Sequence, residues 1–186
     1  MSLVELIAQA DERGLATSAL ACLDRCVPLL GGDDEVLRPL WANLVDAGDP
    51  GAWGGLLEEV RDRIGAGGGA AGDEAAQLAR RMLAAAPGTR AADELRTWAD
   101  ACSVASLRVH RLLDPAEDGA DSVEARREGR TECMSPLVAA ELRRQIQVLE
   151  LLAGHGAGGL RQALEVSIEG RRVLRAVVSR RARVGG

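Results

Sequence analysis

Residues 135–153 read SPLVAAELRRQIQVLELLA. Apolar residues recur in this stretch at steps of four, four, three and four: Val138, Leu142, Ile146, Leu149 and Ala153. That spacing places them on one stripe of an amphipathic helix. Ser135 is a favoured N-cap residue, and Pro136 fits the first helical position, where no backbone N–H is needed. The stretch therefore predicts a long helix with one buried face.

A second amphipathic helix is expected to begin near Leu160, because Gly154 and Gly156 interrupt the first one. Two consecutive helices joined by so short a turn form a hairpin, on which the other helices can pack. The turn, GHGAGG over residues 154–159, also matches the G-x-G-x-x-G pattern of dinucleotide-binding proteins. In such proteins the pattern follows a β-strand, whereas a helix precedes it here, so we interpret it as a helix–helix turn.

Signals for shorter helices recur upstream. Ser2 opens an S-x-x-E capping box, and Asp49-Pro50 combines a cap with a proline at the first helical position. Trp41 and Trp53 fall on consecutive predicted helices and are expected to pack together. No run alternates β-branched and polar residues between turn signals, as a strand would. The prediction is an all-α helical bundle of about seven to eight helices that ends in a long helical hairpin.

We expect a single all-α domain over residues 1–186, because the chain is long enough to bury a core but short for two domains. The Gly-rich linker 65–72 is the best candidate for a sub-boundary. Residues 114–134 contain seven acids, three Arg and few apolar side chains, which predicts a flexible, solvated loop. The functional alternative for this loop is a lid, or a segment that a partner orders.

The composition favours some amino acids strongly over others. Of 186 residues 47% are hydrophobic, yet Phe and Tyr are absent, and all 23 cationic residues other than His are Arg. Phe, Tyr and Lys share A/T-rich codons, so a GC-rich bacterial genome explains their absence. The N-terminus lacks the basic start of a signal peptide, and no apolar run reaches the roughly 18 residues of a membrane span. With only four scattered Cys, these features predict a cytoplasmic protein without disulfides or a membrane segment.

Charge is distributed unevenly along the chain. Residues 1–159 contain 16 Arg and 26 Asp or Glu, a net charge of −10, whereas residues 160–186 contain 7 Arg and 2 Glu, a net charge of +5. The last 17 residues contain no acid and six Arg: Arg171, Arg172, Arg175, Arg180, Arg181 and Arg183. An acidic body repels nucleic acid and anionic lipid, and this end has no aromatic residue for base stacking. The structural interpretation of these Arg is a solvated end that pairs with acids elsewhere on this chain. The functional interpretation, in which all six are partner-binding residues, is docking onto an acidic protein partner or a second copy of the chain.

Three residues are weak catalytic candidates. His110 has Asp114 one helical turn later, and a His oriented by a carboxylate can act as a general base. Cys133 lies in the charged loop and is a candidate reactive thiol. Cys22 and Cys26 lie on an apolar stripe and are expected to be core residues rather than metal ligands. The sequence contains no motif for a metal or a cofactor, so we expect neither.

These features favour a cytoplasmic protein–protein interaction or regulatory module over an enzyme, with homodimerisation as one form of that interaction. The C-terminal hairpin would supply the apolar contact, and its Arg would steer the partner by charge. The alternative is a small-molecule enzyme with an interhelical pocket, in which His110 and Asp114 act and residues 114–134 form a mobile lid. A nucleic-acid accessory protein is a third and weaker hypothesis.

Overall fold

The computed structural model describes residues 1–45, 48–65 and 73–185. These ranges contain eight α-helices and no strand, which confirms the all-α prediction. The helices are α1 (Leu3–Gln9), α2 (Glu12–Arg25), α3 (Arg38–Val45), α4 (Trp53–Gly65), α5 (Glu74–Ala84), α6 (Ala92–Leu113), α7 (Val123–Arg127) and α8 (Pro136–Val184). Two short 3-10 helices, Val27–Leu29 and Pro50–Ala52, lie in the connections. Apart from Gly65, the predicted sub-boundary at 65–72 lies outside the described residues.

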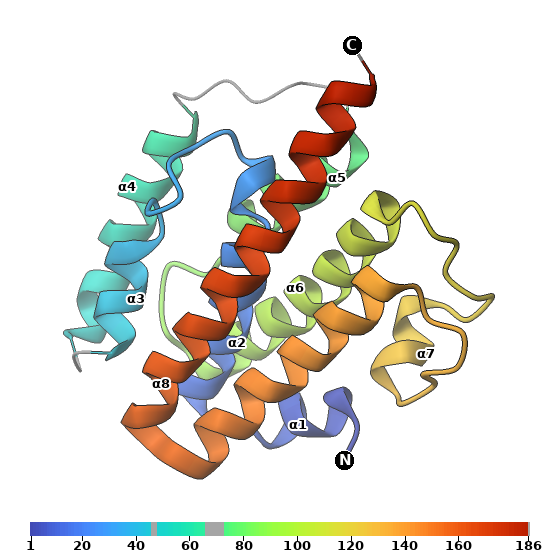
Figure 1. The fold of residues 1–186 in the computed structure, drawn as a ribbon. Coiled ribbons are helices and arrows are strands. Elements are labelled where there is room, and N and C mark those ends of the chain that lie inside the picture. The colour runs from blue at the N-terminus through green and yellow to red at the C-terminus, as the bar shows by residue number, and fades with distance from the viewer. Residues whose placement is uncertain (46–47, 66–72, 186) are drawn as a thin grey trace.

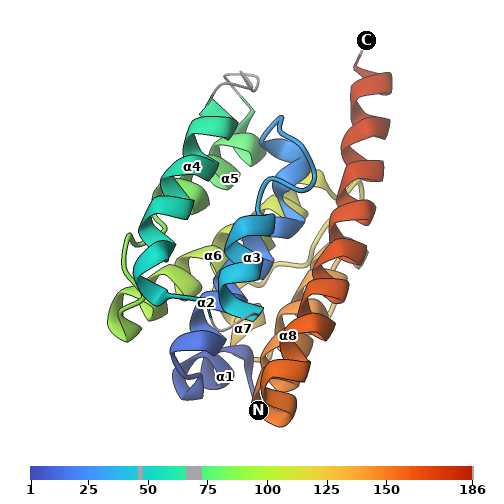
Figure 2. The same ribbon diagram turned by 90° about the vertical axis from the view of Figure 1, so that its left-hand side faces the viewer.

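The central helix of the bundle is α2. Twelve of its 14 residues are buried, and it packs mainly against α6 and α8 (Figure 1). Figure 2 shows α8 on one side of the molecule and α4 and α5 on the other, with α2 between them. The buried residues of α2 are mostly Leu, Ala, Ser and Cys, whose small or slender side chains allow neighbouring helices to approach closely. Two charged residues, Asp24 and Arg25, are buried with them.

The C-terminal helix α8 is the predicted hairpin. It spans 49 residues, but Gly156 has a non-helical φ of 53° and ψ of −127°, and the chain folds back there into two helices. The result is two arms, arm 1 (136–155) and arm 2 (157–184), drawn in orange and red in Figure 1. A Cβ atom added at Gly159 would lie 2.3 Å from the carbonyl oxygen of Leu151, so the arms meet where only glycine fits.

Residues 114–134 differ from the solvated loop that their composition predicts, because they contain α7 and a buried guanidinium. The Arg126 side chain is 0% exposed, and its Nη1 donates hydrogen bonds to the carbonyl oxygens of Arg130 (3.0 Å) and Glu132 (2.6 Å). Asp118 accepts a hydrogen bond from the backbone N–H of Ser135 at 2.8 Å. Arg126 and Asp118 therefore hold the backbone of this segment together, while Glu117, Glu128, Arg130 and Glu132 face the solvent.

Tryptophans join α4 to the α5–α6 connection. The ring packed against Trp53 is Trp98, not Trp41 as the sequence suggested; the ring centroids lie 6.2 Å apart in an edge-on arrangement. The Trp53 indole donates to the carbonyl oxygen of Pro87 at 3.0 Å, and the Trp98 indole donates to that of Met82 at 2.9 Å. Among the described residues, no helix has both the length and the apolar character needed to cross a bilayer.

Candidate functional site

The two predicted acid–base residues do not face one another. His110 is buried, with Nδ1 2.7 Å from the carbonyl oxygen of Ser106 and Nε2 3.6 Å from a carboxylate oxygen of Glu141. The Asp114 carboxylate instead accepts one backbone hydrogen bond from Leu137 at the start of α8, at 2.7 Å, and one from Ala116, at 2.9 Å. The His110–Asp114 pair predicted from their spacing is therefore not formed, because α6 turns His110 towards arm 1.

His110 belongs to a buried charge network that sequence analysis did not predict. Arg25 on α2 and Glu141 on arm 1 form a bidentate ion pair, with N–O distances of 2.8 Å and 2.8 Å. One carboxylate oxygen of Glu141 also accepts hydrogen bonds from Ser106 (2.7 Å) and Gln145 (2.8 Å). The Arg25 and Glu141 side chains are both 0% exposed, so no solute reaches them, and we assign the network a structural role.

The pKa values of Glu141 and His110 are both lowered in this network. Burial alone would raise the pKa of Glu141, but the charge of Arg25 and its hydrogen bonds lower it to about 2. Burial lowers the pKa of His110 against the opposing charge of Glu141. The carboxylate is therefore charged and the imidazole neutral at physiological pH.

A second buried ion pair joins α2 to arm 2. Nη1 of Arg171 lies 3.0 Å and 3.2 Å from the two carboxylate oxygens of Asp24, and it also donates to the carbonyl oxygen of Asp34 at 2.7 Å. Burial raises the pKa of Asp24 to about 6, although Arg171 opposes the shift. Further along arm 2, Arg175 pairs with the Asp34 carboxylate. Two of the six C-terminal Arg are thus paired with acids of this chain.

The free energy of unfolding should therefore contain a contribution from Asp24 that declines as pH rises. The ordinary pKa of 3.8 applies to the unfolded chain, and the folded value is about 6, so the folded state holds this proton more tightly. The contribution is fully present below pH 3.8 and is lost as pH rises through 6. We expect the difference in unfolding free energy between wild type and Asp24→Asn to fall by about 2 kcal/mol between pH 4 and pH 7, measured by urea titration.

Other titrating groups cancel in this comparison, because both proteins contain them. His110 is the important one, since its lowered pKa makes its own contribution rise with pH up to its unfolded value near 6.5. A difference between wild type and Asp24→Asn that stays constant from pH 4 to pH 7 would contradict the assignment.

The remaining C-terminal Arg lie on the outside of arm 2. Arg172, Arg180, Arg181 and Arg183 are exposed, and among the described residues no acid forms an ion pair with any of them. Arg181 makes one long hydrogen bond, 3.4 Å, to the carbonyl oxygen of Leu112 at the end of α6. The positive charge that the sequence places at this end is thus carried by these four Arg rather than by all six.

A groove lies beside these Arg, between the end of α6 and the end of arm 2; we call it the C-terminal groove. Its volume is about 580 Å³, and it is lined by Leu112, Leu113, Asp114, Pro115, Val177, Arg180, Arg181, Val184 and Gly185. Leu112 is 40% exposed and Val184 is 87% exposed, and both are among the few large apolar side chains that face solvent in the described part of the chain. The groove combines exposed apolar surface with unpaired positive charge.

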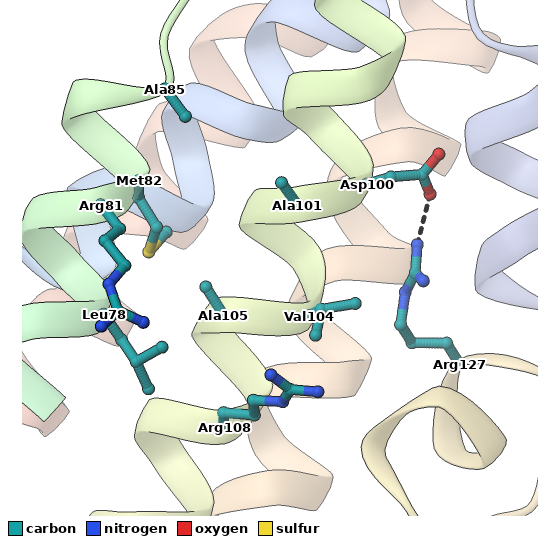
Figure 3. A pocket seen from close by; sticks show the side chains of 10 residues that line it. All are labelled: Leu78, Arg81, Met82, Ala85, Asp100, Ala101, Val104, Ala105, Arg108 and Arg127. Atoms are coloured by element: carbon teal, nitrogen blue, oxygen red, sulfur yellow. Dashed lines mark hydrogen bonds and ion pairs between the residues drawn. The ribbon is translucent and has the colours of Figure 1, made fainter. Parts of the chain in front are cut away.

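A second groove, of about 450 Å³, separates α5 from α6 (Figure 3). Leu78 and Met82 of α5 and the small side chains of α6 give it an apolar lining. Three Arg also line it, but Arg127 is bound to Asp100, as the dashed line shows, and Arg108 pairs with Glu124 at 2.8 Å. Its positive charge is therefore largely neutralised within the chain, in contrast to the C-terminal groove. The residues that line this groove are Leu78, Arg81, Met82, Ala85, Asp100, Ala101, Val104, Ala105, Arg108 and Arg127.

Cys133 should be the single cysteine that reacts rapidly in the native protein. It is exposed, at φ 55°, whereas the other three thiols are buried. Burial raises the pKa of Cys22 to about 12 and also raises the pKa values of Cys26 and Cys102, which suppresses their thiolates. Titration with a chromogenic disulfide should release one equivalent of thiolate quickly and the rest only in denaturant. Native Cys133→Ser should release none quickly, and a second fast equivalent would contradict the prediction.

Comparison with family models, with curated proteins and with solved structures finds no match to this chain.

Proposed function

We propose that this protein is a helical protein–protein interaction or regulatory module, which acts by binding a partner. The binding site is the C-terminal groove, and the partner surface has an apolar centre and acidic flanks. The observation that carries the proposal is the combination of exposed Leu112 and Val184 with Arg180 and Arg181, which pair with no acid among the described residues. Apolar contact would supply affinity, and unpaired guanidinium groups would steer and orient carboxylates.

The alternative, a small-molecule enzyme, receives less support from the same residues. An acid–base pair of His110 and Asp114 requires that they face each other, and each is instead committed to other partners. Residues 114–134, the lid of that hypothesis, bind their own backbone through Arg126. The proposal includes a cytoplasmic location, for which the four unbridged cysteines are the support.

A pair of synthetic helical peptides tests the proposal. Both carry Leu at the a and d positions of a heptad repeat; one has Glu and the other Lys at the remaining positions. In fluorescence anisotropy, the acidic peptide should bind wild type about tenfold or more tightly than the basic one. The charge-reversed variant R180E/R181E should lose that preference.

The matched control is R161E/R172E. Both of its substitutions lie on arm 2 and are exposed, and it changes the net charge by the same amount outside the C-terminal groove. It should bind the acidic peptide nearly as wild type does. Equal binding of the two peptides by wild type, or unchanged binding by R180E/R181E, would overturn the proposal.

A further inference from the structure

We infer that the surface which occupies the C-terminal groove is the same face of a second copy of this chain, related by a two-fold axis along the groove. This inference rests on the proposed function and names its partner. Three observations on one face of the molecule support it: an apolar centre, a basic side and an acidic side.

The acidic side is the chain that follows α6. Residues 111–121 contain four acids and one Arg, and they surround a polar hollow of about 350 Å³. Asp114 and Pro115 line both this hollow and the C-terminal groove, so the two are continuous. Glu117 in the hollow is exposed and forms no ion pair with another described residue. Asp118 and Asp121 already pair with Arg111 and Arg126, so Glu117 is the carboxylate that a guanidinium group from outside would find there.

The basic side is the end of arm 2, across the groove from the acidic side. Arg180 and Arg181 line the groove there, and Arg183 follows two residues after Arg181. The apolar centre between the two sides includes Leu112 and Val184. Figure 1 shows the end of α6 and the red end of arm 2 at the same end of the molecule.

Two-fold symmetry makes such a face complementary to itself. In an isologous contact, a residue on one side of the two-fold axis contacts residues of the other copy that come from the opposite side of the same face. With the axis along the groove, the basic side of each copy meets the acidic side of the other, twice, while the apolar centres meet each other. An unrelated acidic protein would satisfy the Arg but would leave Glu117 and its hollow beside unmatched charge.

Sedimentation velocity tests the inference with the intact chain. Wild type should form dimers reversibly between about 1 μM and 1 mM, the range of weak interfaces, and dimerisation should weaken with added salt. Two variants reverse one side each. R180E/R181E makes both sides acidic, and A116R/E117R/A120R, which changes the net charge of residues 111–121 from −3 to +1, makes both sides basic. Each alone should dimerise about tenfold or more weakly than wild type. R161E/R172E should dimerise as wild type does.

The decisive sample is an equimolar mixture of the two variants. Because one variant is acidic on both sides and the other basic on both, the mixture should form heterodimers at concentrations where each variant alone is monomeric. Helical circular dichroism and melting temperatures matching wild type would show that both variants are folded. A mixture that stays monomeric, or a wild type that is monomeric throughout, overturns the inference.

The outcomes separate this inference from the proposed function. A monomeric wild type that still prefers the acidic peptide, and loses the preference in R180E/R181E, removes the second copy as the partner but keeps the groove as a binding site. Loss of both behaviours removes the proposed function as well.

Discussion

Replacing Glu141 with Gln should lower the free energy of unfolding by about 3 to 5 kcal/mol. The substitution keeps the shape of the side chain but leaves the Arg25 guanidinium buried without its counter-charge. Ser106 and Gln145 donate to the same carboxylate and cannot replace that charge. Urea unfolding followed by far-ultraviolet circular dichroism measures the loss.

A double-mutant cycle distinguishes the pair from its separate residues. Arg25→Met combined with Glu141→Leu removes both charges, so the double variant should be less destabilised than the sum of the single changes by 2 kcal/mol or more. Arg96→Ala is the control, since its ion pair with Asp93 is solvent-exposed and should contribute less than about 1 kcal/mol. Additive effects at positions 25 and 141 would mean that the two charges stabilise the fold independently.

Gly159→Ala should destabilise the protein by about 3 kcal/mol, because its Cβ would lie 2.3 Å from the Leu151 carbonyl oxygen and 2.8 Å from its carbonyl carbon. Both atoms belong to the backbone, so no side-chain rotation relieves the overlap, and the arms of α8 must separate. Thermal unfolding and urea titration both measure this change.

The neighbouring Gly158 gives a matched comparison. An added Cβ there meets nothing within 4 Å, and the residue is helical, so Gly158→Ala should stabilise the protein by up to about 1 kcal/mol. The two substitutions add the same methyl group one residue apart, and their effects should have opposite signs. Equal effects would mean that helix propensity rather than arm contact controls this turn.

Apolar periodicity was sufficient to predict the hairpin, because burial on a helix face repeats with the helical period. Val138, Leu142 and Leu149 are buried as the stripe requires, Ile146 is half-buried, and Ala153 beside the turn is exposed. The stripe ends at the turn between the two arms, where residues 153–158 are exposed. Local sequence contains this information, since each residue of the stripe faces the same side as its neighbours one turn away.

Charged residues were harder to place from the sequence. Arg25 and Glu141 are 116 residues apart, and each is of a residue type that is almost never fully buried without a partner. Only the packing of α2 against arm 1 brings them together. Arg171 shows the same difficulty. It belongs to the basic end by composition, yet its side chain is buried and pairs with Asp24, whereas Arg180 on the same helix is exposed. Composition gives the sum of charges in a segment, not the partner of each.

The positions of the three tryptophans allow the unfolding of α8 to be observed separately from that of α3, α4 and α6. Because the chain has no Tyr, its near-ultraviolet absorption and its intrinsic fluorescence come from α3, α4 and α6, while the 49 residues of α8 emit no light. Far-ultraviolet dichroism, by contrast, weighs every helix by its length. Denaturation curves from the two signals will superimpose if the hairpin and the tryptophan-bearing helices come apart as one cooperative unit. If the hairpin detaches first, the dichroism will fall while the Trp53–Trp98 pair still emits from an intact interior.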